Sequence, residues 1–388
     1  MSPWRGQMVL SCWELVGRIL GTSKDDVSDD DDPDDSSLRS PLFWSIDLEK
    51  HPYGEFSFAV IKGNEVIEDH SQVETGTEAT FVGVYDGHGG PDASRYISRR
   101  LFRNFVRIAK EKGTISENIL RSAVIETEDG FLSFVRGSFG RKPSIAAVGS
   151  CCLVGIIWKG SLYVANLGDS RAVIGSLGES KKVVAEQLTR DHNVSLEEIR
   201  SEVRALHPDD PDIVVENQEV WRIKGIIQAS RTIGDAYMKE PEYNADPRFR
   251  RYYLPLPEPF QRPLLTPEPS LHRRVLQPSD GFVIFASDGL WENLTNQQAV
   301  DIVNKHQRAG IARKLIKRAL KEAAKKRQMN FDDLLRVPDA TRRNFHDDIT
   351  VVVIFVDHDL LEKGASVPEL SVRGFGEVKV CHPTNTSH

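Results

Sequence analysis

Aspartates border apolar, strand-like segments at four places in the sequence. They lie in FVGVYDGHGG (Asp86), LYVANLGDSR (Asp169), FVIFASDGLWE (Asp288) and NFHDDITVVV (Asp347 and Asp348). A carboxylate at the end of a buried strand is held rigidly while it points out of the core. Several carboxylates that converge on one point repel one another strongly, so we expect cations to lie among them.

The residue types around these aspartates favour a particular kind of ion. Oxygen ligands without His or Cys partners suit Mg²⁺ or Mn²⁺ better than zinc. Two such ions, about 3.5–4 Å apart, share a bridging carboxylate and activate a water for in-line attack on phosphorus. Asp86 is the candidate bridge, Gly87 leaves its carbonyl free to reach an ion, and His88 is placed to protonate a leaving oxygen near neutral pH.

A plainer interpretation exists for each of these motifs taken alone. DGHGG is also an ordinary glycine turn with an exposed His, and aspartates after strands often cap turns. That interpretation explains one strand-end carboxylate well, but it explains several in one chain poorly. We therefore predict a metal site that these residues form jointly.

The charge distribution separates an acidic tail from a nearly neutral body. The chain has 388 residues, with 50 basic and 57 acidic side chains and a net charge of −7. Residues 1–35 contain nine acidic and three basic side chains, which leaves 47 − 48 = −1 for the rest. The body thus lacks the basic excess of a nucleic-acid-binding protein. No uncharged stretch reaches the roughly 18 residues that cross a bilayer, and four cysteines without a CxxC pair suit a reducing compartment.

Short apolar runs predict strands, and longer periodic segments predict helices. The predicted strands are 56–61, 80–85, 150–158, 161–167, 171–175, 281–286 and 349–356. The predicted helices are 91–112, 115–136, 296–306 and 311–328, of which the third opens with a capping box of Thr295 and Gln298. Lys159-Gly160 predicts a tight antiparallel hairpin. Strands and helices that come in pairs favour an α+β layered fold.

Four further segments have a distinct composition. Residues 8–20 carry apolar side chains at helical spacing, which fits a weakly ordered leader or a short amphipathic helix for a membrane surface or a partner. Residues 25–35 are a like-charge block that predicts disorder. Eight prolines in 241–269 predict a surface loop without regular structure. The basic face of 311–328 fits a solvated helix, or a docking surface for an acidic partner or for the acidic tail.

Six motifs in the sequence together resemble those of one known family. VIEDH, FVGVYDGHGG, LGDSRAV, QASRTIGDAY, FASDGLWE and DDITVVV occur in the order of the metal-dependent protein phosphatase 2C family, most like its plant clade D branch. The resemblance covers about residues 50–360. It implies a four-layer α-β-β-α sandwich with two antiparallel sheets, and a single catalytic domain at 42–360 between a flexible leader (1–41) and a C-terminal tail (361–388).

The resemblance also implies roles for individual residues. Asp86 resembles the carboxylate that bridges two Mg²⁺ or Mn²⁺ ions, Gly87 the carbonyl ligand, and His88 the general acid. Asp288 and Asp347 resemble ligands of the second ion. The remaining acidic positions match residues that hold metal-bound waters or a third ion: Glu68, Asp69, Asp169 and Glu292. Arg231 and Asp235 match an arginine–carboxylate pair that fastens a loop near the site.

Three positions depart from the family pattern. Asn64 stands where many members have an arginine that grips the substrate phosphate, and a neutral amide cannot make that charged contact. Lys62, two residues earlier and so on the same face of a strand, is a candidate substitute. Glu292 stands where Asp is frequent, and Asp348 where Asn is usual. Only one of Asp347 and Asp348 should face an ion, because neighbouring strand residues point to opposite sides.

These observations predict a protein serine/threonine phosphatase that uses a metal-activated water and forms no phosphoenzyme. The alternatives are a phosphatase-like binding or regulatory module with little turnover, and a hydrolase of small phosphate esters. Expected partners are phosphorylated proteins and inhibitory regulatory proteins, without nucleic acid and without a transmembrane segment. We expect a monomer in the cytosol or nucleus, with a peripheral plasma-membrane location as an alternative if residues 8–20 bind lipid.

Overall fold

A six-stranded antiparallel sheet forms one half of the core in the computed structural model, which describes residues 42–251, 256, 260–361, 364–376 and 379–381. Its strands follow the order β1–β2–β16–β15–β9–β10. Their bounds are Phe43–His51 (β1), Gly54–Ile61 (β2), Ile349–Phe355 (β16), Asp280–Ala286 (β15), Arg171–Leu177 (β9) and Val183–Gln187 (β10). The leader and the acidic block predicted before residue 42 lie outside the described residues.

A seven-stranded antiparallel sheet packs against the first, in the order β14–β8–β7–β4–β3–β17–β18. Its strands are Ser270–Val275 (β14), Ser161–Leu167 (β8), Cys152–Trp158 (β7), Ala79–Tyr85 (β4), His70–Thr75 (β3), Glu369–Arg373 (β17) and Lys379–Cys381 (β18). The predicted hairpin is confirmed, because β7 and β8 pair around Lys159 (φ 47°) and Gly160 (φ 68°). Two consecutive positive φ values are those of a type I′ turn.

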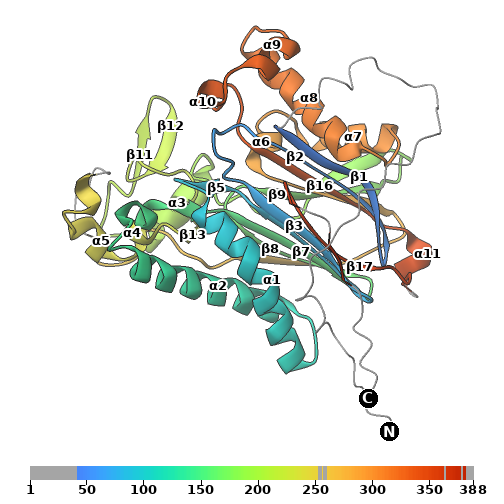
Figure 1. Ribbon diagram of the computed structural model, residues 1–388, viewed down its shortest axis with the longest axis horizontal. Coiled ribbons are helices and arrows are strands. Elements are labelled where there is room, and N and C mark those ends of the chain that lie inside the picture. Colours follow the sequence, from blue (N-terminus) through green and yellow to red (C-terminus); the bar gives the residue numbers. More distant parts are fainter. Residues whose placement is uncertain (1–41, 252–255, 257–259, 362–363, 377–378, 382–388) are drawn as a thin grey trace.

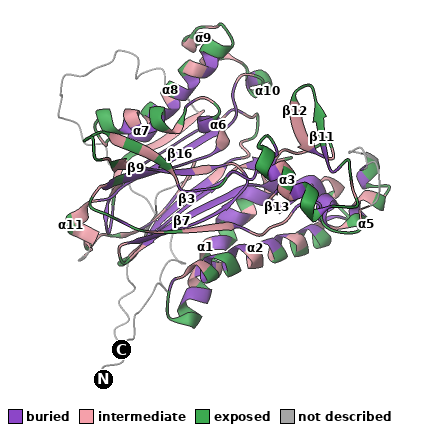
Figure 2. Cartoon of the chain, turned by 180° about the vertical axis from the view of Figure 1, so that it is seen from behind, coloured by how far each residue is buried: buried purple, intermediate pink, exposed green. Residues whose placement is uncertain are grey.

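Helices cover both outer faces, so the predicted four-layer sandwich is confirmed (Figure 1). The long helices α1 (Asp92–Lys112) and α2 (Glu117–Ser138) pack on the seven-stranded sheet. Helices α7 (Asn296–Lys305) and α8 (Ile311–Lys326) pack on the six-stranded sheet. The buried strands lie between helices whose outer faces are exposed (Figure 2).

The alternation of side chains along one central strand shows how the layers form. On β16, Val351 and Val353 join the core beneath α7 and α8, whereas Val352 and Ile354 join the core between the sheets. Period-2 alternation with apolar residues on both faces is expected for a strand that is covered on both sides. Each such buried side chain contributes about 1.5–3 kcal/mol relative to exposure.

The remaining elements are short. They are β5 (Gly87–His88), β6 (Gly149–Ser150), β11 (Val214–Asn217), β12 (Val220–Ile223), β13 (Ile233–Gly234), α3 (Glu197–Leu206), α4 (Ala236–Lys239), α5 (Pro241–Ala245), α6 (Asp288–Trp291), α9 (Phe331–Arg336), α10 (Asp339–Arg342), α11 (His358–Leu361) and the 3₁₀ helices Pro143–Ala147 and Phe249–Arg251. The capping box predicted at Thr295 and Gln298 opens α7.

Two predictions about loops and boundaries differ from the structure. The proline-rich segment contains α5 and a 3₁₀ helix, and it buries Tyr243, Phe249 and Leu264, so regular structure is not excluded there. Proline is tolerated at the first position of a helix, as at Pro241. The segment predicted as a tail after residue 360 contributes β17, which pairs with β3 and buries Val372. In the described part of the chain, no helix has the length and apolarity needed to cross a membrane.

The buried histidine His51 ties the two sheets together. Its Nε2 donates to the carbonyl of Phe355 on β16 at 2.9 Å, and its Nδ1 lies 2.9 Å from Thr80 Oγ1 on β4. Burial lowers the His51 pKa from 6.5 to about 4. The unfolded chain therefore takes up this proton at a higher pH than the folded chain does, so stability falls as the pH drops from 6.5 towards 4.

We predict that His51→Gln removes this part of the acid sensitivity. Between pH 7 and pH 4, the wild type should lose on the order of 3 kcal/mol of unfolding free energy relative to the variant. Urea unfolding of both proteins in excess chelator, at several pH values, measures the difference. A difference that does not change with pH would contradict the prediction.

Candidate metal centre

Three aspartates meet at one end of the sandwich. Asp86 follows β4, Asp169 lies between β8 and β9, and Asp288 follows β15 at the first position of α6. One carboxylate oxygen from each of the three lies within 4.8 Å of the other two. The three residues come from both sheets. Their approach agrees with the prediction that carboxylates at these strand ends converge.

The electrostatics of these carboxylates fit a bound cation. Burial, and then repulsion from Asp288 and Asp69, raise the pKa of Asp86 well above its usual range. Burial, and then Asp347 and Asp169, do the same for the pKa of Asp288. The Oδ1 atom of Asp288 is buried without a hydrogen-bond partner. A buried orphan oxygen among like charges is costly unless an ion completes the site.

Asp347 lies beside this trio but outside it. Its Oδ2 forms an ion pair with Arg343 Nη1 at 2.5 Å. Its Oδ1 accepts a hydrogen bond from Asn64 Nδ2 at 3.3 Å. Burial raises the Asp347 pKa to about 7, although Arg343 opposes the shift. The structure thus brings the predicted ligand to the centre and adds a guanidinium that the sequence analysis missed.

The neighbouring Asp348 points away from the trio and holds a loop instead. Both of its oxygens accept backbone N–H groups of the segment between β2 and β3. These donors are Gly63 (2.6 Å) and Asn64 (2.9 Å) to Oδ1, and Glu68 (2.7 Å) and Asp69 (3.2 Å) to Oδ2. As predicted, only one of the two adjacent aspartates faces the centre.

The other predicted acidic residues surround the trio. Asp69 is buried, and its Oδ2 accepts from Ser287 Oγ at 2.8 Å and Thr350 Oγ1 at 2.7 Å. Burial raises the pKa of Glu68. Glu292 is the residue after α6, four positions from Asp288, and its charge adds to the rise of the Asp288 pKa. Asp169 accepts from Asn193 Nδ2 at 2.6 Å, a contact that nothing in the sequence pattern indicated.

Gly87 needs to be glycine for a packing reason. A Cβ atom there would lie 2.5 Å from the carbonyl oxygen of Glu68 and 2.8 Å from Ser94 Oγ. Gly87 and His88 form β5, which pairs with β6, and β6 in turn pairs with β13. This small three-stranded sheet fixes the direction of His88.

His88 pairs with Asp235, 147 residues further along the chain. The Nε2 atom lies 2.9 Å from Asp235 Oδ2. Asp235 has a left-handed backbone (φ 50°) and accepts from Thr232 Oγ1 at 2.7 Å. Burial alone would lower the His88 pKa, but the Asp235 carboxylate outweighs it and raises the pKa above its ordinary value.

The predicted pair of Arg231 with Asp235 is wrong. Arg231 donates to Glu202 Oε1 at 2.6 Å and to the carbonyl of Glu268 at 2.9 Å, while Asp235 binds His88. Asp235 lies in the left-handed region of the backbone, four residues after Arg231. The segment is held by a buried ion pair between Lys239 and Glu128, at 2.5 Å, instead.

Gly149 lies against the His88–Asp235 pair, and a side chain there should separate it. A Cβ atom would lie 2.1 Å from Asp235 Oδ2 and 2.4 Å from His88 Nε2. We predict that Gly149→Ala lowers turnover by about 10- to 100-fold, as losses of supporting contacts commonly do. Gly137→Ala on α2 is the matched control, because nothing lies within 4 Å of its Cβ position. Steady-state assays of both folded variants measure the difference in turnover. Equal activities of Gly149→Ala and Gly137→Ala would contradict the prediction.

Lys62 and Asn64 do not share a strand face, because β2 ends at Ile61. Lys62 Nζ pairs with Asp339 Oδ2 at 3.1 Å. Asn64 instead faces the centre through its contact with Asp347. The premise that made Lys62 a substitute for the missing arginine is therefore wrong.

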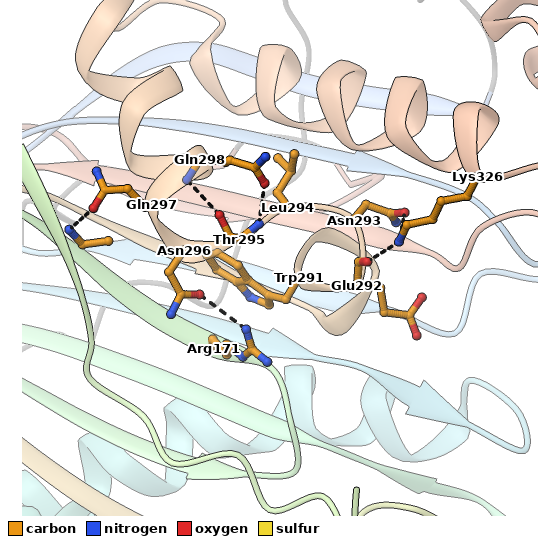
Figure 3. Close-up of a pocket in the computed structure, with 11 residues that line it drawn as sticks. Arg171, Trp291, Glu292, Asn293, Leu294, Thr295, Asn296, Gln297, Gln298 and Lys326 are labelled. Carbon is orange, nitrogen blue, oxygen red and sulfur yellow. Dashed lines mark hydrogen bonds between the residues drawn. The ribbon is translucent and has the colours of Figure 1, made fainter. Parts of the chain in front are cut away.

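A hollow of about 560 Å³ adjoins Glu292 between α6, α7 and β10. Its polar groups are bonded among themselves: Arg171 to Asn296, Gln298 to Thr295, and Lys326 to the carbonyl of Glu292 (Figure 3). The Glu292 carboxylate projects away from these contacts (Figure 3). Lys326, on the basic face of α8, lines this hollow.

Comparisons with known proteins identify the family of this chain. Residues 61–329 match the family model described as protein phosphatase 2C. "Probable protein phosphatase 2C 43" of Oryza sativa is 59% identical over 97% of this chain and 96% of its own length. "Probable protein phosphatase 2C 68" of Arabidopsis thaliana is 61% identical over the same shares of the two chains.

A solved structure supports the fold on its own evidence. The serine-threonine phosphatase 2C from Toxoplasma gondii is 17% identical and superposes with a TM-score of 0.59, over 82% of this chain and all of that one. At this identity the likeness concerns the fold, and the finer resemblance to plant clade D stays a prediction. The family model spans more than half of the residues and the relatives match over nearly their full length, so the chain belongs to the protein phosphatase 2C family.

Proposed function

We propose that the centre around Asp86 removes phosphate from phosphoserine and phosphothreonine in protein substrates with the help of two Mg²⁺ or Mn²⁺ ions. Family membership makes the chain a protein serine/threonine phosphatase. The approach of three carboxylates to within 4.8 Å, with an orphan oxygen on Asp288, carries the assignment of the centre. When bound, the ions would supply an activated water for direct attack on phosphorus.

The residues of the chain divide the remaining work. We propose that Asp86, the Gly87 carbonyl, Asp288 and Asp347 hold the two ions. His88 gives a proton to the departing serine or threonine oxygen. Because Nε2 is engaged by Asp235 at 2.9 Å, that proton has to leave from Nδ1. The raised His88 pKa keeps the ring protonated to a higher pH, which suits a general acid.

Other residues are proposed to act around the two ions. Glu68 and Asp69 keep metal-bound waters in place, and Asp169 and Glu292 hold a third ion. The buried thiols of Cys151 and Cys152 support a reducing compartment, the cytosol or nucleus. We also propose that the protein is a monomer and that inhibitory regulatory proteins bind it.

Hydrolysis of a phosphothreonine peptide with and without chelator tests the ion-dependent reaction. We expect turnover with millimolar Mn²⁺ or Mg²⁺, loss of it in excess EDTA, and recovery when the ion is restored. Turnover that persists in EDTA would reject the mechanism. A binding module with an intact centre would take up the ions without turnover, and a small-ester hydrolase would prefer metabolites to phosphopeptides.

A further inference from the structure

Arg343 is a cation at the edge of a cluster of carboxylates. Its Nη1 atom lies 2.5 Å from Asp347 Oδ2, yet 54% of its side chain is exposed to solvent. Burial alone would lower the Arg343 pKa, but the charge of Asp347, and then those of Asp288, Asp86 and Glu292, outweigh it and raise the pKa. The guanidinium thus lies between the centre and the solvent from which a substrate arrives.

The turn that carries Arg343 is anchored by the preceding residue. Arg342 is buried, with 4% of its side chain exposed, and its guanidinium pairs with Asp339 at 2.9 Å and donates to the carbonyl of Val337 at 2.6 Å. Two adjacent arginines therefore have different tasks, since one fixes the end of α10 and the other projects to the centre.

Three other side chains near this edge, among the residues that the structure describes, are neutral or already paired. Asn64 is neutral and reaches the same carboxylate as Arg343, through Asp347 Oδ1 at 3.3 Å. Lys62 pairs with Asp339, and Lys326 donates to Asn293 Oδ1 at 3.2 Å. A phosphate monoester carries up to two negative charges, and a guanidinium fork matches its oxygens as well as it matches a carboxylate.

We propose that Arg343 binds the phosphoryl oxygens of the substrate, and that it leaves Asp347 when the carboxylate is needed for an ion. Arg343 then has two opposite effects. In the ion-free protein its positive charge competes with an incoming cation for Asp347. In the loaded protein the same charge holds phosphate. The proposal rests on the proposed function of the centre.

Full-length Arg343→Gln and Arg343→Lys variants test both effects. A lost charged hydrogen-bond pair costs about 1.5–3 kcal/mol, so Arg343→Gln should weaken inhibition by inorganic phosphate by about 10- to 100-fold. It should also bind Mn²⁺ several-fold more tightly than the wild type in calorimetry on chelator-stripped protein. Arg343→Lys keeps the charge without the guanidinium fork. Its inhibition by phosphate should therefore lie between those of the wild type and Arg343→Gln, and its affinity for Mn²⁺ should be close to that of the wild type.

Arg336→Gln is the matched control, because this arginine pairs with Asp333 on α9 and is 78% exposed. This variant should leave the inhibition constant for phosphate and the dissociation constant for Mn²⁺ unchanged. Unchanged phosphate inhibition in Arg343→Gln, or weaker Mn²⁺ binding, would overturn the proposal, since a merely structural arginine would weaken both. If the wild type hydrolyses no phosphopeptide, the proposed function fails, while calorimetry with Mn²⁺ and with phosphate in excess Mg²⁺ still decides the role of Arg343.

Discussion

Replacing Asp86 with asparagine should lower turnover of a phosphothreonine peptide by about 10³-fold or more. Asp86 is one of the four residues proposed to hold the two ions, and metal catalysis is worth several kcal/mol of barrier. Asparagine keeps the shape of the side chain but carries no charge. The rate in saturating Mn²⁺ measures the effect, and an active Asp86→Asn enzyme would remove Asp86 from the mechanism.

The same substitution should stabilise the ion-free protein, which separates a lost ligand from a damaged fold. The folded state raises the pKa of Asp86, so at pH 7 folding either buries a charge or takes up a proton. Asparagine removes this cost, and its advantage should fade as the pH falls towards the ordinary carboxyl range.

Thermal unfolding in EDTA and in Mn²⁺ should therefore rank the two proteins in opposite orders. The variant is expected to be more stable in EDTA, and the wild type in Mn²⁺, because ions that bind the folded state stabilise it. Asp301→Asn on α7, where the carboxylate is 46% exposed, is the control and should change neither order. A variant that is less stable in EDTA would show that Asp86 supports the fold without ions.

Asp348→Ala should destabilise the protein by about 3–5 kcal/mol. Asp348 is 1% exposed and accepts four backbone N–H groups. Each buried donor left without a partner costs about 1–3 kcal/mol, although relaxation of the loop recovers a part. Urea unfolding in excess chelator isolates this effect from ion binding. A loss below about 1 kcal/mol would mean that water replaces the carboxylate without difficulty.

Asp348→Asn refines the same test. The amide oxygen of asparagine can still accept the two N–H groups that donate to one oxygen of Asp348. The amide NH₂ group would face the other two N–H groups, which it cannot accept. We expect a loss of stability between that of the wild type and that of Asp348→Ala. A weaker hold on Glu68 and Asp69 should also lower turnover. An asparagine variant as stable as the wild type would show that the loop rearranges to satisfy the amide.

Much of the fold follows from local patterns. Apolar runs identified the central strands, and the capping box and the Lys159-Gly160 turn were both correct. Two strands were missed for physical reasons. β1 (FWSIDLEKH) lies at the edge of its sheet, where charged and polar residues are tolerated. β3 (HSQVET) lies inside its sheet, but its Gln72 and Glu74 accept hydrogen bonds from Arg373, so the strand lacks an apolar run. Order along the chain does not say which strands pair, so the resemblance supplied the two-sheet arrangement.

The sequence likewise predicts some residues of the site but not the contacts that hold them. Asp86, Asp169 and Asp288 could be predicted, since buried strands end at one edge and point their carboxylates out of the core. The partners of these residues could not. His88 binds Asp235 across 147 residues, and Arg343 stands beside an arginine with a structural task. Such contacts depend on how loops cross in space, which no local spacing encodes.

The origin of the three aspartates in both sheets has a consequence for the lifetime of the protein. An ion held by Asp86 and Asp288 would join β4 of one sheet to β15 of the other at the end of the sandwich. Depletion of that ion would then remove a cross-link as well as a catalyst, and it would leave three crowded carboxylates that repel one another across the two layers. A shortage of divalent cations would thereby make the protein more susceptible to proteolysis. Its abundance in the cell, and not only its catalytic rate, would then depend on the supply of these cations.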